Sequence, residues 1–586
     1  MEIIFLHFAL ILFTAFIVAY VIRTFNQPLI IGYIFAGIIV ALIIETSYIE
    51  IGATKEIIDV FSKFGIAFLL FIVGLNLNPR VIKEIGFVSI VTGLGQILFT
   101  FIGGYFIAYL LGFDMIASIY IGLALAFSST IIAMKLLSDK KKINSLYGKI
   151  SIGILIIQDF VAVIALLFIS SIEGIEGGFI GNIDAILFVS KNLIGGSILI
   201  FFLITLGFFA IPKIVRRIAD TQELLFLFSI CWCFIIAALF DVLGFSIEIG
   251  ALIAGIMLSM SPYSTEMSAR IRPLRDFFLI IFFIILGFNI FTTNISNPIG
   301  GIESLLFNAL IFSAFVLIGN PLIIMFFMAL SGYTKKTNFS VGITLSQISE
   351  FSIIVATLGV GVGHINQEVL GTLALTLVIT IMISTYMISY SKEFYSKVSR
   401  FVSIFEKKKI KKGKKVTREY NAILFGYNRI GFGILRSLKK LKKKYLVIDF
   451  NPDTINALTK LRIPALYGDA DDAELIRELP LEKIDMAVST IPDYETNVLI
   501  IETVRMVNPD AIIIARAHSI EDALDLYQKG ASYVLTPHFL GGEYISKMIE
   551  KDKIDLEDYK KERKKHVKSL RDIKQKGYQH PDIDRD

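Results

Sequence analysis

The stretch GILIIQDFVAVIALLF, residues 153–168, is almost entirely apolar, yet it contains one carboxylate, Asp159, directly after the amide side chain of Gln158. With its apolar flanks it is long enough to cross the hydrocarbon core of a bilayer as a helix. A charged side chain inside such a helix is costly, so it marks a candidate functional site. The stretch therefore predicts a membrane helix built around a functional carboxylate.

The composition of the whole chain supports a membrane protein. Its 586 residues are 55% hydrophobic and 18% charged, and the mean hydropathy is +0.71, well above that of soluble proteins. The net charge of +6 comes largely from short loops and the basic run 406–415. Membrane orientation explains these basic residues, so we expect the lipid bilayer as a partner and no nucleic acid.

Apolar runs predict thirteen membrane spans. Basic residues follow the odd-numbered spans and acidic residues the even-numbered ones, which places the N-terminus outside a cell membrane and the C-terminal domain in the cytoplasm. Arg272 and Arg275 fit this orientation signal, although a salt bridge to a core carboxylate is an alternative role. The predicted spans are 3–22, 28–44, 57–77, 85–111, 115–137, 149–170, 186–211, 222–240, 246–260, 274–291, 303–331, 339–362 and 368–390.

Polar groups of three spans fall at one depth. Asp159 lies ten residues after Lys149, about 15 Å into the membrane and near its middle. There it has to face a cavity, bind a cation or take up a proton, so proton and cation compete for it. The alternative is that these groups only hydrogen-bond neighbouring helices. The other candidates for binding the cation or proton are Gln158 beside Asp159, Ser128, Ser129 and Thr130 in span 115–137, and Ser346, Gln347 and Glu350 in span 339–362.

Six strings in this order resemble the Kef-type members of the monovalent cation:proton antiporter family. They are FLLFIVGLNLNP (68–79), LALAFSSTIIAMKLL (123–137), GILIIQDF (153–160), GALIAGIML (250–258), FFIILGF (282–288) and LSQISEF (345–351). The resemblance implies an all-α polytopic membrane domain of about thirteen helices in an inverted repeat, and a homodimer. It also implies that spans 115–137 and 339–362 are broken helices that cross beside an ion-binding Asp159.

The pair Gln158–Asp159 stands where sodium-type relatives often have two aspartates. The resemblance then implies exchange of one cation, K⁺ in preference to Na⁺, for one H⁺. The physical reason is that a single carboxylate holds either one proton or one cation, so their alternation moves no net charge. Asn76 departs from the family's usual Glu at the end of its span, where we expect it to alter contact with the regulatory domain and not the core chemistry.

From residue 419 the pattern changes to short apolar strands alternating with amphipathic helices, which predicts a cytoplasmic α/β Rossmann-like domain with a doubly wound parallel sheet. The predicted strands are YNAILFG, YLVIDF, PALYG, MAVST, AIIIARA and YVLT. The predicted domains are a transmembrane exchange domain (1–390), a basic linker (391–418), the Rossmann-like regulatory domain (419–540) and a charged helical tail (541–586).

The first strand is followed by GYNRIGFG (426–433), a dinucleotide-binding fingerprint in which Asn428 replaces the middle glycine. Asp449, at the end of the second strand, fits a partner for a ribose hydroxyl and disfavours a 2′-phosphate. The domain resembles the regulator-of-potassium-conductance (TrkA-N) type, which implies a regulatory adenine nucleotide such as NAD(H) or AMP. A purely structural Rossmann fold is the alternative. The candidate nucleotide-binding residues are Gly426, Asn428, Arg429, Ile430, Gly431, Asp449, Asp469, Ala470, Thr490 and Arg516.

These predictions favour a nucleotide-regulated cation/proton antiporter. The alternative is a potassium channel gated by a nucleotide or by glutathione, but its nearest filter-like string, TLGVGVG (357–363), has no Tyr at the position of the TVGYG filter. A membrane oxidoreductase needs haem-ligating His pairs or Cys clusters, which the membrane spans do not contain. We therefore expect no enzyme activity, no redox cofactor and no metal besides the transported cation.

Overall fold

The computed structural model divides into two compact units, Met1–Glu406 and Lys407–Asp586, which we describe separately. The described residues are 2–47, 52–76, 87–140, 142–143, 145–170, 215, 218, 221–242, 247–259, 261, 263–295, 301–402, 405, 420–427, 429–449, 452–468, 470–471, 473–552 and 556–575.

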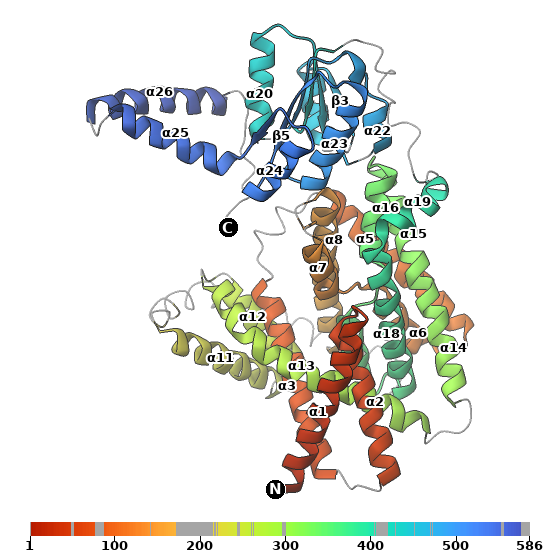
Figure 1. Ribbon diagram of the computed structural model, residues 1–586. Coiled ribbons are helices and arrows are strands. Elements are labelled where there is room, and N and C mark those ends of the chain that lie inside the picture. The colour runs from red at the N-terminus through yellow and green to blue at the C-terminus, as the bar shows by residue number, and fades with distance from the viewer. Residues whose placement is uncertain are drawn as a thin grey trace, which may run out of the picture. The chain divides into compact units, whose positions relative to one another are not determined.

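The described residues of the first unit lie mainly in helices (Figure 1). Every predicted span except 186–211, which lies outside the described residues, falls on helical structure. By length and hydropathy, eight helical segments among the described residues can cross a membrane, and four shorter ones are also apolar. The helices are α1 (Glu2–Thr24), α2 (Leu29–Ser47), α3 (Gly52–Asn76), α5 (Phe87–Leu110), α6 (Met115–Ala126), α7 (Thr130–Asp139), α8 (Leu146–Ser170), α11 (Gln222–Val242), α12 (Ile247–Ser259), α13 (Ser264–Ile295), α14 (Gly301–Ala314), α15 (Asn320–Leu330), α16 (Lys335–Thr344), α17 (Glu350–Gly361), α18 (Gln367–Ser389) and α19 (Ser391–Val402).

Two of the predicted spans are broken helices, as the family resemblance implies. In the first, α6 ends at Ala126 and α7 begins at Thr130, because Phe127 and Ser129 have extended backbone conformations. In the second, α16 ends at Thr344 and α17 begins at Glu350. A third span is continuous but contains the π-helical turn Phe315–Gly319 between α14 and α15. The breaks leave backbone groups inside the unit without a helical partner, so side chains have to pair with them.

Glycines allow some helices of the first unit to approach backbone to backbone. A Cβ atom on Gly255 of α12 would lie 2.1 Å from the carbonyl oxygen of Phe71 on α3. Facing it, a Cβ on Gly74 of α3 would lie 2.3 Å from the carbonyl oxygen of Leu252. Small residues at such positions are the usual means by which membrane helices pack closely.

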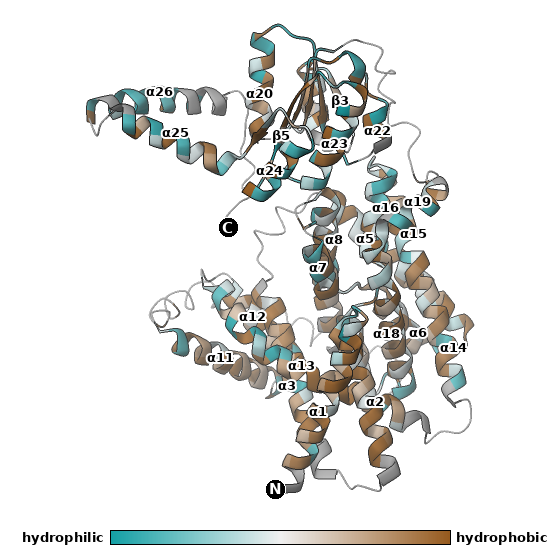
Figure 2. Cartoon of the chain, in the orientation of Figure 1, coloured by the Kyte–Doolittle hydropathy of each residue, from teal (hydrophilic) through white to brown (hydrophobic). Residues whose placement is uncertain are grey.

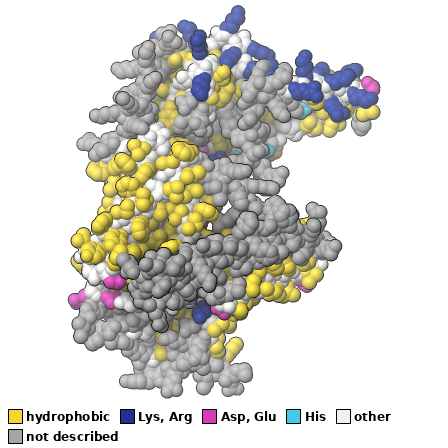
Figure 3. Space-filling model, turned by 180° about the vertical axis from the view of Figure 1, so that it is seen from behind, with side chains coloured by type: hydrophobic (Ala, Val, Ile, Leu, Met, Phe, Trp, Pro, Cys, Tyr) yellow, Lys and Arg dark blue, Asp and Glu magenta, His cyan; other side chains and the backbone are white. Residues whose placement is uncertain are grey.

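The outer surface of the first unit is apolar. Brown, hydrophobic ribbon dominates its helices in Figure 2, and hydrophobic side chains cover much of its described face in Figure 3. On α5, for example, Leu98, Phe99 and Phe106 are more than half exposed. Helices with exposed large apolar side chains are expected where the solvent is lipid.

The second unit contains the predicted six-stranded parallel sheet, in the order β3-β2-β1-β4-β5-β6. Apolar clusters lie on both faces, one including Phe425 and α23 and the other including Leu435 of α20. The sheet is therefore doubly wound, as predicted, and its order reverses between β1 and β4. The elements are β1 (Ala422–Phe425), α20 (Arg429–Lys440), β2 (Tyr445–Asp449), α21 (Pro452–Lys460), β3 (Ala465–Tyr467), α22 (Ala473–Arg477), the 3₁₀ turn Leu481–Lys483, β4 (Met486–Ser489), α23 (Tyr494–Val507), β5 (Ile512–Arg516), α24 (Ile520–Gln528) and β6 (Tyr533–Leu535).

Two further helices follow the sheet, α25 (Pro537–Asp552) and α26 (Leu556–Gln575). Helix α25 begins before residue 541, where the sequence predicts the tail to start. Helix α26 carries many Lys and Arg side chains, which gather along it in Figure 3, and pairs of the i,i+3 type such as Lys560–Glu557. Such exposed pairs contribute little stability.

Candidate functional site

The carboxylate of Asp159, on α8, lies at the break between α6 and α7. Thr130, the first residue of α7, donates its hydroxyl to Asp159, with Oγ1 at 3.1 Å from Oδ1 and 3.0 Å from Oδ2. Asp159 as a whole residue is half-buried. A carboxylate at a helix N-terminus is also stabilised by the helix dipole. The site thus combines an anionic ligand with a neighbouring hydroxyl.

A second carboxylate, that of Glu350, meets the same break from the other broken helix. The hydroxyl of Ser129 donates to Glu350, with an Oγ–Oε2 distance of 2.8 Å. Ser129 is also the N-cap of α7, because its Oγ accepts from the backbone N–H of Ile132 at 3.3 Å. Glu350 is only 4% exposed and is the first residue of α17. Consecutive residues of one break therefore hold two carboxylates from two other helices.

The two breaks are joined directly. The hydroxyl of Ser128 donates to the carbonyl oxygen of Leu345 at 2.9 Å, which connects the end of α6 with the end of α16. A shorter contact runs from the Ser352 hydroxyl to the carbonyl oxygen of Ala124. The predicted residues 128, 129, 130, 159 and 350 are therefore brought together by the fold.

The remaining predicted residues have contacts of a different kind. Gln158 is fully buried, and its Oε1 accepts from the backbone N–H of Ser128 at 3.1 Å. Ser346 donates to the carbonyl oxygen of Ile343 at 2.8 Å, within its own chain turn. Gln347 donates from Nε2 to the carbonyl oxygen of Thr344 at 3.3 Å. Among the described residues, the Oε1 atom of Gln347 has no hydrogen-bond partner although it is buried.

Sequence reasoning missed Gln96, on α5, and Asn320, at the start of α15. Gln96 accepts from Gln158, with Oε1–Nε2 2.5 Å, and Thr100 donates to Asn320, with Oγ1–Oδ1 2.7 Å. Both are fully buried amides in apolar spans, and that signal is visible in the sequence. It does not reveal which helix each amide contacts.

For Arg275, on α13, the sequence allows either an orientation signal or a salt bridge to a core carboxylate. Its guanidinium pairs with the neighbouring Asp276 at 2.7 Å. The side chain of Asp276 is 55% exposed, so this ion pair is not one with a core carboxylate.

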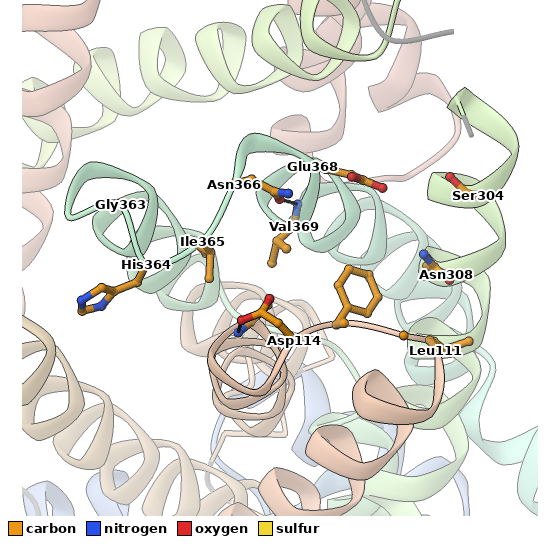
Figure 4. A pocket seen from close by; sticks show the side chains of 13 residues that line it. Leu111, Asp114, Ser304, Asn308, Gly363, His364, Ile365, Asn366, Glu368 and Val369 are labelled. Atoms are coloured by element: carbon orange, nitrogen blue, oxygen red, sulfur yellow. Dashed lines mark hydrogen bonds between the residues drawn. The ribbon is translucent and has the colours of Figure 1, made fainter. Parts of the chain in front are cut away.

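A cavity of about 680 Å³ lies apart from this site, where α5 turns into α6 and α17 into α18 (Figure 4). Asp114, on its wall, caps α6 by accepting from the backbone N–H groups of Ile116 and Ala117 at 3.1 and 3.3 Å. His364 is hydrogen-bonded to Tyr120, with Nδ1–OH 2.9 Å, and its burial lowers its pKa. None of the predicted site residues lines this cavity.

In the second unit, the predicted glycines fit the tight turn after β1. Gly426 has φ +85°, and a Cβ there would lie 2.6 Å from the Thr490 hydroxyl oxygen. A Cβ on Gly431 would lie 2.2 Å from the carbonyl oxygen of Gly426. Thr490 donates to that same carbonyl oxygen at 3.0 Å. These are the close approaches for which a dinucleotide fingerprint uses glycine.

The other described candidates lie at or just beyond the carboxyl ends of the strands. Asp449, 8% exposed at the end of β2, accepts from the backbone N–H of Tyr427 at 2.8 Å. Arg516, at the end of β5, donates from Nη1 to the carbonyl oxygen of Thr490 at 3.4 Å. Ala470 is buried after β3. Asn428 and Asp469 lie outside the described residues, as does the side chain of Arg429, while Ile430 is half-buried in α20.

This edge is where open α/β sheets bind ligands, beside the point at which the strand order reverses. The described part of the chain contains no group of three or more His, Cys, Asp or Glu side chains that could hold a metal ion.

Comparisons with known proteins agree with both units. Residues 11–390 match the family model "Sodium/hydrogen exchanger, transmembrane", and residues 422–537 match the TrkA-N domain. The putative cation/proton antiporter YbaL of Escherichia coli (strain K12) is 26% identical over 89% of this chain and 92% of its own length.

Two further relatives carry potassium in their names. K(+) efflux antiporter 5 of Arabidopsis thaliana is 31% identical over 61% of each chain. The glutathione-regulated potassium-efflux system protein KefC of Escherichia coli O17:K52:H18 (strain UMN026 / ExPEC) is 26% identical over 86% of this chain and 77% of its own length. The chain therefore belongs to the sodium/hydrogen exchanger family of transmembrane proteins and carries a TrkA-N domain after its membrane part, which confirms the predicted Kef-type architecture.

Proposed function

We propose that this protein exchanges a monovalent cation, K⁺ in preference to Na⁺, for H⁺ at Asp159. One observation carries the proposal: the Asp159 carboxylate lies at the break between α6 and α7 beside the Thr130 hydroxyl, one residue from the contact of Ser129 with Glu350. Broken helices near the middle of a membrane are a recurrent way to build ion sites in transporters. Relatives named as cation/proton and K⁺ efflux antiporters support the same class.

The ligands available to a dehydrated cation are oxygens. Asp159 supplies the anionic oxygen, and Thr130 a hydroxyl oxygen beside it. We add the Oε1 atom of Gln347, because it is the buried amide oxygen at the second break without a partner among the described residues. Its orientation follows from chemistry, since the carbonyl oxygen of Thr344 can only accept and so fixes the nitrogen at the other end.

The exchange is electroneutral in this proposal, although two carboxylates are present. In this proposal Glu350 keeps one protonation state throughout the cycle, because it is 4% exposed and already accepts from the Ser129 hydroxyl. Only Asp159 then alternates between a proton and a cation, and one charge replaces another.

The test is proton flux into liposomes that contain the purified protein, driven by a gradient of K⁺ or of Na⁺. Asp159→Asn should abolish the flux, whereas Glu303→Gln, which neutralises an exposed carboxylate at the start of α14, should leave it unchanged. An imposed thiocyanate diffusion potential should not alter the rate. Flux that survives in Asp159→Asn, or cation current without proton movement, would reject the proposal and favour a channel.

The TrkA-N domain is proposed to bind a regulatory adenine nucleotide. Support comes from the glycine turn of Gly426 and Gly431 and from the position of Asp449 beside it. NAD⁺, NADH or AMP should raise the melting temperature of the full-length protein in detergent, and NADPH should not, because Asp449 disfavours a 2′-phosphate. Asp449→Asn should weaken the effect. Equal stabilisation by NADH and NADPH would contradict the assignment of Asp449.

We also propose a homodimer in the cell membrane with the N-terminus outside and the TrkA-N domain in the cytoplasm. Chemical crosslinking in membranes tests the dimer. Labelling of single cysteines placed in the loops tests the orientation, after Cys231, which is exposed in the structure, has been replaced.

A further inference from the structure

The break between α6 and α7 leaves backbone groups that a continuous helix would pair. Helix α6 ends at Ala126 and α7 begins at Thr130, so the carbonyl of Ala126 and the N–H of Ser128 have no helical partner. Inside a membrane each such group costs free energy unless a side chain pairs with it.

Two glutamines from different helices join these two groups. The N–H of Ser128 donates to Oε1 of Gln158 at 3.1 Å, and Nε2 of Gln158 donates to Oε1 of Gln96 at 2.5 Å. Nε2 of Gln96 then donates to the carbonyl oxygen of Ala126 at 3.1 Å. The chain of hydrogen bonds therefore links the N–H of Ser128 to the carbonyl of Ala126 through two side chains. Both glutamines are fully buried.

The orientation of both amides follows from the ends of this chain. A backbone N–H can only donate, so the atom of Gln158 that faces Ser128 is the oxygen. A backbone carbonyl can only accept, so the atom of Gln96 that faces Ala126 is the nitrogen. The bond between the two amides then has a donor facing an acceptor, without any freedom to reverse.

A further contact holds Gln96 in place from a third side. Its Nε2 also donates to the Thr100 hydroxyl at 3.1 Å, and Thr100 in turn donates to Asn320 at 2.7 Å. Asn320 directly follows the π-helical turn, a deviation that is frequent at functional sites.

We propose that Gln96 and Gln158 are positioning residues that fix the α6–α7 break, and that Gln158 is not a ligand of the cation; this inference rests on the proposed function. Both ends of the Gln158 amide are already bonded within the protein, the oxygen to the N–H of Ser128 and the nitrogen to Gln96, and the next residue, Asp159, contacts Thr130. Consecutive residues of α8 therefore hold the two ends of the segment 128–130. The pair of glutamines sets where the hydroxyls of this segment point.

The arrangement also explains an amide at position 158. A glutamate there has no N–H for Gln96 and would place an oxygen against the Gln96 oxygen, which lies 2.5 Å from the atom now present. Two acceptors at that distance repel each other, so an amide fits this position where a carboxylate on a side chain of the same length does not.

The test compares Gln96→Met, Gln158→Met and the double variant, because methionine keeps the length of the side chain without its hydrogen bonds. Thr92→Val is the matched control, since Thr92 is a fully buried α5 residue whose hydroxyl has no partner in the described part of the chain. The readouts are the KM for the cation and the maximal rate in liposomes, and the melting temperature in detergent.

Each single variant should raise the KM about tenfold, since it leaves buried polar groups without partners, while the maximal rate falls much less. The double variant should match the worse single variant, because both changes break one chain. Thr92→Val should resemble the wild type. If the Gln96→Met protein does not accumulate, the Gln96→Glu variant replaces it. Glutamate keeps the oxygen that faces Gln158, so the KM of this variant should lie between those of the wild type and Gln158→Met.

Additive losses in the double variant would overturn the proposal. A second outcome would also overturn the proposal: Gln158→Met is inactive at every cation concentration, whereas Gln96→Met resembles the control. Gln158 would then be a ligand of the cation. The melting temperatures test the inference without transport. Non-additive losses of melting temperature support the hydrogen-bond chain through Gln158 and Gln96 even if the wild type shows no exchange. In that case only the proposed function fails.

Discussion

The Ser129 hydroxyl donates to the Glu350 carboxylate at 2.8 Å, across 221 positions of sequence. The bond joins the first residue of α17 to the N-cap of α7. The second halves of the two broken helices therefore begin at one contact. Both N-termini carry partial positive charge, which stabilises the carboxylates between them. The ion site proposed here depends on this contact as much as on Asp159.

Ser129→Ala should weaken cation binding, because it removes both the partner of Glu350 and the cap of α7. Loss of such a cap costs about 1 kcal/mol, so we expect a KM raised about fivefold and a lower melting temperature. Ser313→Ala is the control, since the Ser313 hydroxyl is buried without a partner among the described residues. If the two variants have the same KM, the contact of Ser129 with Glu350 has no role in binding.

Gly255→Ala should separate α12 from α3. The new Cβ would lie 2.1 Å from the Phe71 carbonyl oxygen, so the helices have to move apart, and overpacking of this kind costs about 1–3 kcal/mol. The measurement is thermal unfolding in detergent. Gly361→Ala, where nothing lies within 4 Å of the new Cβ, should leave the transition in place. Equal melting temperatures for both variants would show that the close packing is not needed.

Gly426→Ala should impair nucleotide binding by the TrkA-N domain. The residue has φ +85°, which strains any side chain, and the Cβ would lie 2.6 Å from the Thr490 hydroxyl. We expect little or no stabilisation by the nucleotide in thermal unfolding of this variant. In Gly433→Ala the Cβ meets nothing within 4 Å and α20 gains helix propensity, so nucleotide stabilisation should persist. The reverse pattern would remove the turn from the proposed site.

Tyr494 should titrate at unusually high pH. Its hydroxyl donates to Asp525, and this hydrogen bond, with burial and nearby negative charge, raises the pKa of Tyr494 to about 12. Because the pKa is raised in the folded protein, the hydrogen bond contributes its full stabilisation of the fold below the ordinary tyrosine pKa of about 10. This stabilisation is lost as the pH rises toward the folded-state pKa. Alkaline absorbance titrations of the wild type and of Tyr494→Phe should therefore differ by one group near pH 12. A difference centred near pH 10 would indicate that the bond is absent.

The sequence predicted the elements of both units well. Apolar length located the membrane helices, and short β-rich runs located all six strands and their parallel arrangement. It also identified Asp159 and the polar segments 128–130 and 346–350 as candidates, because polar groups are rare at that depth. These signals are local in the chain, so a single sequence contains them.

The tertiary structure alone decided which polar group meets which. Nothing in the sequence assigns Ser129 to Glu350 and Thr130 to Asp159, or joins Gln158 to Gln96 instead of to a cation. The physical reason is that a hydrogen bond forms only when donor and acceptor come within hydrogen-bonding distance. Which polar side chains of the membrane helices meet therefore depends on how each helix is rotated about its axis and on where α6 and α16 end. Those quantities follow from the packing of the whole unit, whereas apolar length and residue type follow from the sequence itself.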